Sequence, residues 1–175
     1  MVAVIIACEI GFWVLLVAGL AARYVLRARR VSTALLLAVP AVDVVLLAVA
    51  LIDLLNGGEA DPAHGLAAVY IGTSVAFGAQ MIGWADQRFA HRFAGGPPPV
   101  KPPRTGPEHA ARERRQWTRH LLAYVIGAAV LGVFTALAGD LDRVRPLWSV
   151  LGVWTLVLVI DFMISFSYTL FPRRR

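Results

Sequence analysis

The sequence predicts an all-α membrane protein, a polytopic helix bundle with five transmembrane helices. Of its 175 residues, 58% are hydrophobic and only 16% are charged, and the mean hydropathy is +0.67. That composition is too apolar for a soluble domain. Several apolar runs reach the roughly 20 residues that a helix needs to cross ~30 Å of hydrocarbon. Because they lack the alternation typical of membrane β-strands, they predict helices.

The five apolar runs predict spans at 2–26, 33–55, 66–85, 121–139 and 147–171. The first run has one feature of a signal peptide, since the small residues at 18–22 resemble a cleavage site. However, no basic residue precedes the run, Glu9 interrupts it, and it is longer than a typical signal-peptide core. We therefore expect a retained transmembrane helix.

Arginine and lysine are distributed unevenly between these runs. Fifteen of the 17 lie at 23–30, 86–120 and 173–175, whereas the connection before the fifth run holds only Arg143 and Arg145. Basic residues of short loops stay in the cytoplasm. The sequence therefore predicts an N-terminus outside and a C-terminus in the cytoplasm. Placement beside apolar runs also explains the net charge of +6 without a nucleic acid partner.

The longest connection, 86–120, has two parts. A glycine- and proline-rich linker at 95–103 is expected to be extended. A charged helix is then predicted from Glu108 to His120, running into the fourth span, with Pro107 in its first turn. Three of its arginines recur at spacings of three and four residues, and we expect them to contact anionic lipid headgroups. A cytoplasmic protein partner is the alternative. The three arginines are Arg112, Arg115 and Arg119.

Small residues recur on one face of the third run and on one face of the fourth. Such faces allow two helix backbones to approach closely, so the two helices are expected to pack against each other, with an oligomer interface as the alternative. Five crossings do not divide into two equal inverted halves, which argues against a complete inverted-repeat transporter in one chain. The residues assigned to packing are Gly72, Ala76, Gly83, Ala128 and Gly132.

Carboxylates inside apolar runs are the most informative polar residues. Each costs about 2.5–3.5 kcal/mol at mid-membrane on insertion scales, and no lysine or arginine lies deep in a run to pair with it. Such acids stay neutral and hydrogen-bonded, bind a cation or relay protons, or meet a basic group of another molecule. Similar depths and shared helix faces predict one polar cavity. Its candidate residues are Asp43, Asp161, Gln80, Ser74, Glu9, Ser165 and Tyr168.

Motifs for metals, cofactors and catalysis are missing from the sequence. Cys8 is the single cysteine, which excludes an intramolecular disulfide and a cysteine metal cluster. His91 and His120 are the histidines closest to matched depths, and a haem or metal between them is not expected. There is no phosphate loop, HExxH, GxSxG or CxxC motif. We therefore expect no cofactor and no enzyme.

Five stretches, at 9–13, 23–26, 39–43, 64–72 and 84–89, resemble the YmcC-like family of small bacterial integral membrane proteins. The resemblance covers roughly the first 100 residues, and the last two helices look generic. It implies a location in the bacterial cytoplasmic (inner) membrane, but it implies no activity and lends no catalytic residue. The polar residues within or beside these stretches are Glu9, Asp43, His64, Tyr70 and Asp86.

Two functions remain open from the sequence. The first is a small transporter or an ion- or proton-coupling unit that uses unpaired carboxylates inside the membrane. The second is a non-catalytic accessory or assembly subunit that binds a larger membrane complex, either as a homo-oligomer or with another membrane protein.

Overall fold

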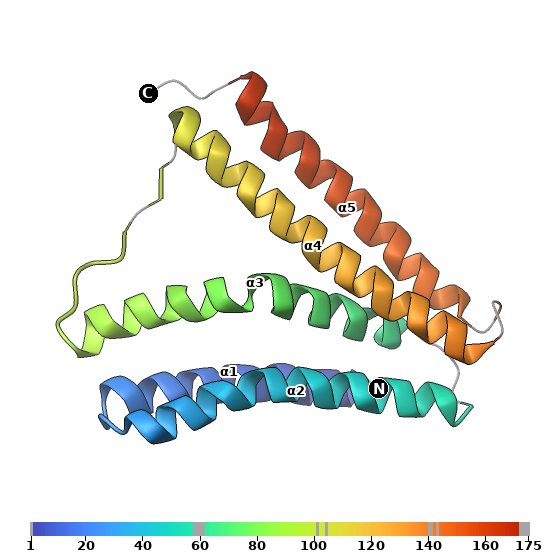
Figure 1. Ribbon diagram of the computed structural model, residues 1–175, viewed down its shortest axis with the longest axis horizontal. Coiled ribbons are helices and arrows are strands. Elements are labelled where there is room, and N and C mark those ends of the chain that lie inside the picture. Colours follow the sequence, from blue (N-terminus) through green and yellow to red (C-terminus); the bar gives the residue numbers. More distant parts are fainter. Residues whose placement is uncertain are drawn as a thin grey trace. The chain divides into compact units, whose positions relative to one another are not determined.

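The computed structural model describes residues 2–57, 62–100, 102–103, 105–139, 142 and 144–171, and within α1 and α2 it leaves the side chains of Glu9 and Asp43 undescribed. The described residues form helices joined by turns and coil, with no strand among them, which confirms the all-α prediction. Figure 1 shows the helices in chain order. They are α1 (Val2–Tyr24), α2 (Arg29–Leu55), α3 (Pro62–Phe93), α4 (Gly106–Ala138) and α5 (Arg145–Leu170).

Four segments of the described chain are long and apolar enough to cross a membrane. They are Ile6–Tyr24, His64–Phe93, Gly106–Ala138 and Arg145–Leu170. Their lengths of 19 to 33 residues reach or exceed the roughly 20 residues that a bilayer core requires.

The helices extend past the predicted spans on both sides of the long connection. α3 continues to Phe93 although its apolar run ends near Ala85, and α4 begins at Gly106, with a proline in its first turn. The coil between these two helices is therefore 94–105, which contains the predicted linker, and the charged helix predicted at 108–120 is the first part of α4. Hydropathy marks where a helix leaves the hydrocarbon, but a helix of charged residues continues into water.

The sequence predicts one transmembrane domain, whereas the structure divides the chain into two compact units. The first, here called the α1–α2 unit, consists of 1–58 and 77–99, and the second, the α4–α5 unit, consists of 59–76 and 100–175. Helix α3 contributes its first part to the α4–α5 unit and its last part to the α1–α2 unit.

In the α1–α2 unit, α1 and α2 lie side by side as a hairpin (Figure 1). The turn between them contains Arg27 at φ 56°, the left-handed conformation that often ends a helix. A Cβ placed on Gly19 would lie 2.9 Å from Leu36 Cδ2, so glycine allows the two helices to approach. A cluster of buried apolar side chains forms its core. It includes Phe12, Leu16, Leu20, Val39 and Ala85.

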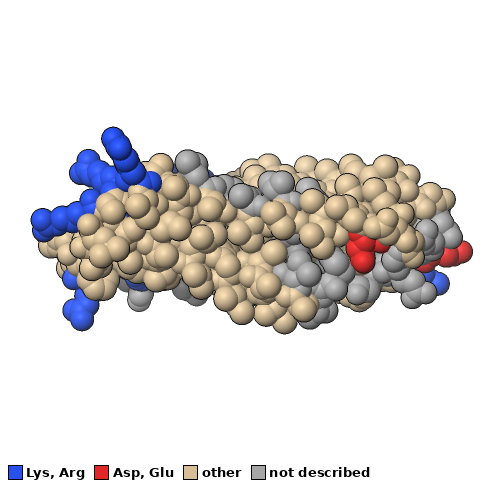
Figure 2. Space-filling view, turned by 90° about the horizontal axis from the view of Figure 1, so that it is seen from below, with Lys and Arg blue, Asp and Glu red and all other residues tan. Residues whose placement is uncertain are grey.

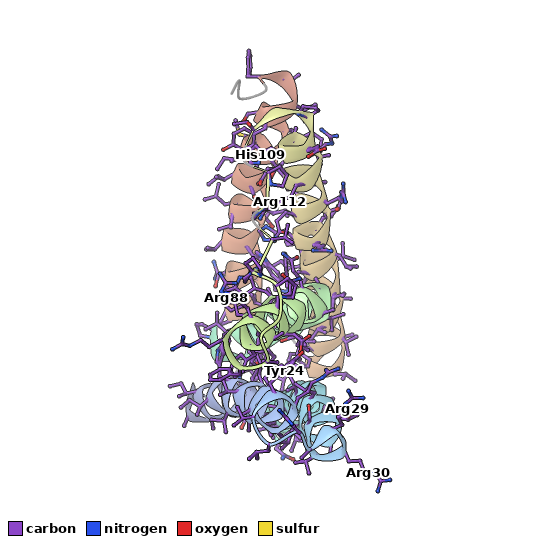
Figure 3. All side chains as sticks on the ribbon, turned by 90° about the vertical axis from the view of Figure 1, so that its left-hand side faces the viewer. Tyr24, Arg29, Arg30, Arg88, His109 and Arg112 are labelled. Atoms are coloured by element: carbon purple, nitrogen blue, oxygen red, sulfur yellow. The ribbon has the colours of Figure 1, made fainter. Side chains whose placement is uncertain are left out.

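Basic side chains gather at the turn end of this hairpin, as Figure 2 shows. Arg23 lies in the last turn of α1, Arg27 lies in the connecting turn, and Arg29 begins α2, and all three are exposed. In Figure 3, which looks onto this end, Arg30 points away from the helices. The hairpin is therefore charged at this end and apolar along its length.

In the α4–α5 unit, α4 and α5 are antiparallel neighbours joined at Gly139, which ends α4 in the left-handed conformation at φ 68°. The first part of α3 packs on both helices. A Cβ on Gly72 would collide with the carbonyl oxygen of Ala123, and a Cβ on Gly127 would lie 3.1 Å from the carbonyl oxygen of Ala68. On α5, Val150 fills the space beside Gly65.

The packing residues require a correction. Gly72 lies at a close helix crossing, but a Cβ added to Gly83 or Gly132 would have no neighbouring atom within 4 Å, and Ala76 and Ala128 are half-buried. Helix α4 meets α3 through Ala123 and Gly127 instead of through Ala128 and Gly132. A shift of one residue rotates a side chain by about 100° around a helix, so the two sets face different directions.

Candidate polar site between α4 and α5

A chain of hydrogen bonds links α4 to α5. His120 of α4 lies with Nδ1 2.9 Å from Asp161 Oδ2, and Trp154 donates its indole N–H to His120 Nε2 at 3.0 Å. The Ser165 hydroxyl is 3.4 Å from Asp161 Oδ1. Trp154, Asp161 and Ser165 are seven and four residues apart, which places them on one face of α5. We call Trp154, His120 and Asp161 the polar triad.

The partners of His120 define where its proton lies. An indole nitrogen only donates, so Nε2 must accept, and the single hydrogen of a neutral imidazole is then on Nδ1. That hydrogen is donated to the carboxylate of Asp161. A doubly protonated His120 would have a hydrogen on Nε2 and would lose the bond to Trp154. The polar triad therefore holds a neutral histidine against an accepting carboxylate.

The polar triad lies where the charged part of α4 gives way to its apolar part. His120 follows Arg119 directly and precedes an apolar stretch that continues to Ala138. Asp161 lies nine residues before the end of α5 at Leu170, about 14 Å along the helix axis. The side chains of His120 and Asp161 keep 18% and 33% of their accessible surface. The two side chains are therefore only partly buried.

Aromatic packing fixes Trp154. Its ring occupies the space beside Gly127, where a Cβ would collide with it. The ring of Tyr124 packs edge-on against it at 5.4 Å between centroids, and the Tyr124 hydroxyl shares a hydrogen bond of 2.8 Å with Thr155. Nearer the start of α4, Trp117 Nε1 donates to the Leu158 carbonyl at 3.3 Å. The indole that holds His120 thus has little freedom to rotate.

The interpretation of Asp161 as an unpaired acid was wrong. The sequence offers it no arginine or lysine, but His120, which was assigned to the cytoplasmic connection, is its partner. One signal pointed to the pair. The two residues are about equally far from the α4–α5 turn, and the arms of an antiparallel hairpin bring such positions to one level.

The other predicted cavity residues have different neighbours in the described structure. Ser165 is buried beside Asp161, and the Tyr168 ring packs at 4.8 Å on His109, which Figure 3 labels between α4 and α5. Ser74 belongs to the α4–α5 unit and Gln80 to the α1–α2 unit. The side chains of Asp43 and Glu9 lie outside the described residues. A cavity shared by the whole set stays a prediction.

The α1–α2 unit has its own polar cluster, at its basic end. Tyr24 donates its hydroxyl to Asp86 Oδ1 at 2.8 Å, and Arg23 Nη1 is 3.9 Å from the same oxygen. The guanidinium of Arg88 lies 3.8 Å above the ring of Trp84. These contacts tie α1 to the last turns of α3. Across the described residues, no group of three or more histidine, cysteine or acidic side chains is placed to hold a metal ion.

Comparison with known proteins gives one relative of similar length. The chain is 43% identical over 171 residues to "Uncharacterized membrane protein YmcC" of Bacillus subtilis (strain 168), a match that covers 97% of this chain and 91% of that protein. The chain belongs to the YmcC family. No family model and no solved structure matches it.

Membership of the YmcC family agrees with the apolar helices in identifying a membrane protein. It also extends the resemblance found in the sequence. That resemblance was limited to about the first 100 residues, whereas a match over 97% of the chain includes α4 and α5. The helices that carry the polar triad are therefore part of the family's common length.

Proposed function

We propose that this YmcC family member crosses the bacterial inner membrane five times, with α2 crossing in addition to the four helices that hydropathy identifies. We further propose that it couples to protons or a small cation through its polar triad. Its N-terminus is outside and its C-terminus is in the cytoplasm. The support for this orientation is the basic end of each unit. In the α1–α2 unit arginines gather at the end of α1 and the start of α2, and in the α4–α5 unit they gather at the start of α4.

The observation that carries the coupling proposal is the 2.9 Å contact between His120 Nδ1 and Asp161 Oδ2 at the edge of an apolar helix pair. Ionisable residues inside membrane segments are costly and mark ion and proton paths. Asp161 retains a third of its side-chain surface, so its carboxylate is open to exchange. His120 has one nitrogen occupied by Trp154, which directs its proton to Asp161.

A purely structural clamp would have the same contacts. Hydrogen bonds between membrane helices contribute roughly 0.6–2 kcal/mol each, and a serine or glutamine would provide them without an ionisable group. The partial exposure of both side chains favours coupling, because a clamp is strongest when it is fully buried.

The test is proton and cation flux into proteoliposomes that hold the purified protein and a pH-sensitive dye. Asp161→Asn and His120→Gln are expected to lower the flux at least tenfold, whereas Asp86→Asn, which alters a hydrogen-bonded carboxylate of the other unit, is expected to leave it within twofold. Asp43→Asn measures whether the predicted cavity takes part. A wild-type flux equal to that of empty vesicles would contradict the coupling proposal.

A second candidate is an accessory subunit of a membrane complex. It is favoured by the outward face of α4 around Gly132, an exposed glycine at which an added Cβ would meet no atom within 4 Å. Gentle extraction and co-purification test it. A stable partner that is lost in Gly132→Leu supports this function, because that substitution leaves the described packing of the chain intact. Protein that is recovered alone counts against it.

A further inference from the structure

One face of α4 is charged in its first part and apolar in its second. Arg112, Arg115 and Arg119 are exposed and spaced three and four residues apart. The same spacing continues to Leu122, Ile126, Ala129 and Val133. Leu122 and Val133 keep 50% and 54% of their surface, and Ala129 is also exposed. We call the three arginines the arginine stripe and the four residues after it the apolar stripe.

Other side chains of α4 face α5. His109, Trp117 and His120 contact α5, and Arg114 donates to the Thr169 hydroxyl of α5 at 2.7 Å. The arginine stripe lies about 100° or more around the helix from most of these side chains. Arg112 approaches Glu113 at 3.7 Å with 45% of its side chain exposed, which is a weak surface pair.

The level of the arginine stripe relative to the hydrocarbon follows from α5. If α5 enters the bilayer near Leu147, about 20 residues bring it to the far boundary near Phe166. His120 lies beside Asp161, five residues before that boundary, and Arg115 is five residues from His120 along the antiparallel α4. Arg115 is therefore level with the boundary of the hydrocarbon, and Arg115 and Arg119 reach the phosphates by extending their side chains outward.

We propose that the arginine stripe and the apolar stripe together bind an anionic phospholipid of the cytoplasmic leaflet. The arginines take the phosphate, with which guanidinium groups form paired hydrogen bonds. The acyl chains lie along Leu122, Ile126 and Val133. The charge pattern agrees with this occupant. The face changes from basic to apolar at one level, and a phospholipid changes from an anionic headgroup to apolar acyl chains in the same way.

The experiment is native mass spectrometry of the full-length protein released from vesicles that contain equal amounts of phosphatidylglycerol and phosphatidylcholine. Wild-type protein is expected to retain the anionic lipid. The variant with Arg112→Gln, Arg115→Gln and Arg119→Gln is expected to retain at least tenfold less, because it removes the guanidinium groups that bind the phosphate above the apolar stripe. The matched control, Arg29→Gln with Arg30→Gln and Arg92→Gln, removes three exposed charges of the α1–α2 unit and is expected to change retention less than twofold.

A second measurement separates a lipid from a free phosphate and does not depend on the folding of the triple variant. Inorganic phosphate added in excess is expected to leave the wild-type lipid bound, because the acyl chains contribute along the apolar stripe. Displacement by phosphate alone, equal retention of both lipids, or equal retention by the triple variant and wild type would each overturn the proposal. Its failure would leave the flux proposal untouched, since the arginine stripe and the polar triad lie on different faces of α4.

Discussion

The two units use polar side chains in different places. In the α1–α2 unit the packed core cluster is apolar, and the cluster of Tyr24, Asp86 and Arg23 lies at the basic end of the helices. In the α4–α5 unit the chain from Trp154 through His120 to Asp161 lies between the helices, at the edge of their apolar part. Both clusters link two helices. Of the two, the second places its ionisable pair beside apolar helix surface rather than at a charged end.

This difference suggests separate roles: apolar packing stabilises the α1–α2 unit, whereas the ionisable pair of the α4–α5 unit is the candidate functional site. A tyrosine–aspartate contact at a charged end has water as an alternative partner and contributes little. A histidine–aspartate pair beside apolar helix surface is costly to keep unless each group satisfies the other. The following changes test whether the units differ in this way.

The largest effect is expected from Gly72→Ala. Its new methyl group would meet the backbone carbonyl of Ala123, which cannot move aside without displacing α4. We expect a loss of about 3 kcal/mol in the free energy of unfolding, measured by thermal unfolding in detergent. Gly132→Ala is the matched control. It places a methyl group in open space and is expected to be neutral or stabilising by up to about 1 kcal/mol. Similar effects of the two changes would contradict the described α3–α4 crossing.

Leu20→Ala tests the claim that apolar packing holds the α1–α2 unit. Leu20 is fully buried in the core of that unit. Removing three carbons leaves a cavity, and we expect a cost of about 2–3 kcal/mol in the free energy of unfolding. The control is Val17→Ala on the same helix, where 49% of the side chain is exposed and the expected cost is below about 0.5 kcal/mol. If both substitutions cost the same, burial does not decide the stability of this unit.

Trp154→Phe tests the polar triad. Phenylalanine keeps a ring beside Gly127 but removes the N–H that occupies His120 Nε2. We expect a cost of about 1 kcal/mol in the free energy of unfolding, together with altered proton flux because His120 is no longer restricted to one tautomer. Trp148→Phe, an exposed position on the same helix, is expected to change neither quantity. A flux equal to that of wild type would show that Trp154 does not direct the proton of His120.

The smallest effect is expected from Tyr24→Phe. The lost hydrogen bond to Asp86 is partly exposed, so water replaces it, and the expected cost is about 0.5–1 kcal/mol. A double-mutant cycle with Asp86→Asn measures the coupling directly. A coupling energy larger than that between His120 and Asp161, measured in the same way, would reverse the comparison between the two units.

The helical class followed from the sequence because hydropathy and length decide it, and in the described chain four of the five predicted spans correspond to helices long and apolar enough to cross a membrane. Helices α1 and α2 end at Tyr24 and Leu55, within two residues of the predicted ends. The charged helix leading into the fourth span was also predicted, with Pro107 in its first turn. The ends of α3 were missed, whereas the linker predicted at 95–103 lies within the observed connection, 94–105. Helix continuation beyond the hydrocarbon depends on local propensity and capping, which hydropathy does not measure.

The candidate site was only partly predictable. Asp161 was selected correctly as a residue inside an apolar helix, and its neighbour Ser165 was placed on the same face. Its partner was missed, because lysine and arginine were the expected counter-charges and His120 was assigned to the cytoplasmic connection. Rotation about the helix axis caused the second error, the choice of Gly132 rather than Gly127, since small residues occur on several faces of α4.

The most direct test of the polar triad is the tautomer of His120, measured from the nitrogen chemical shifts of selectively ¹⁵N-labelled protein in lipid. The hydrogen bonds predict a neutral ring with its hydrogen on Nδ1 in wild type, and a mixture of tautomers in Trp154→Phe. A ring with its hydrogen on Nε2, or one whose shifts ignore both Asp161→Asn and Trp154→Phe, would contradict the pairing of His120 with Asp161 on which the proposed function rests.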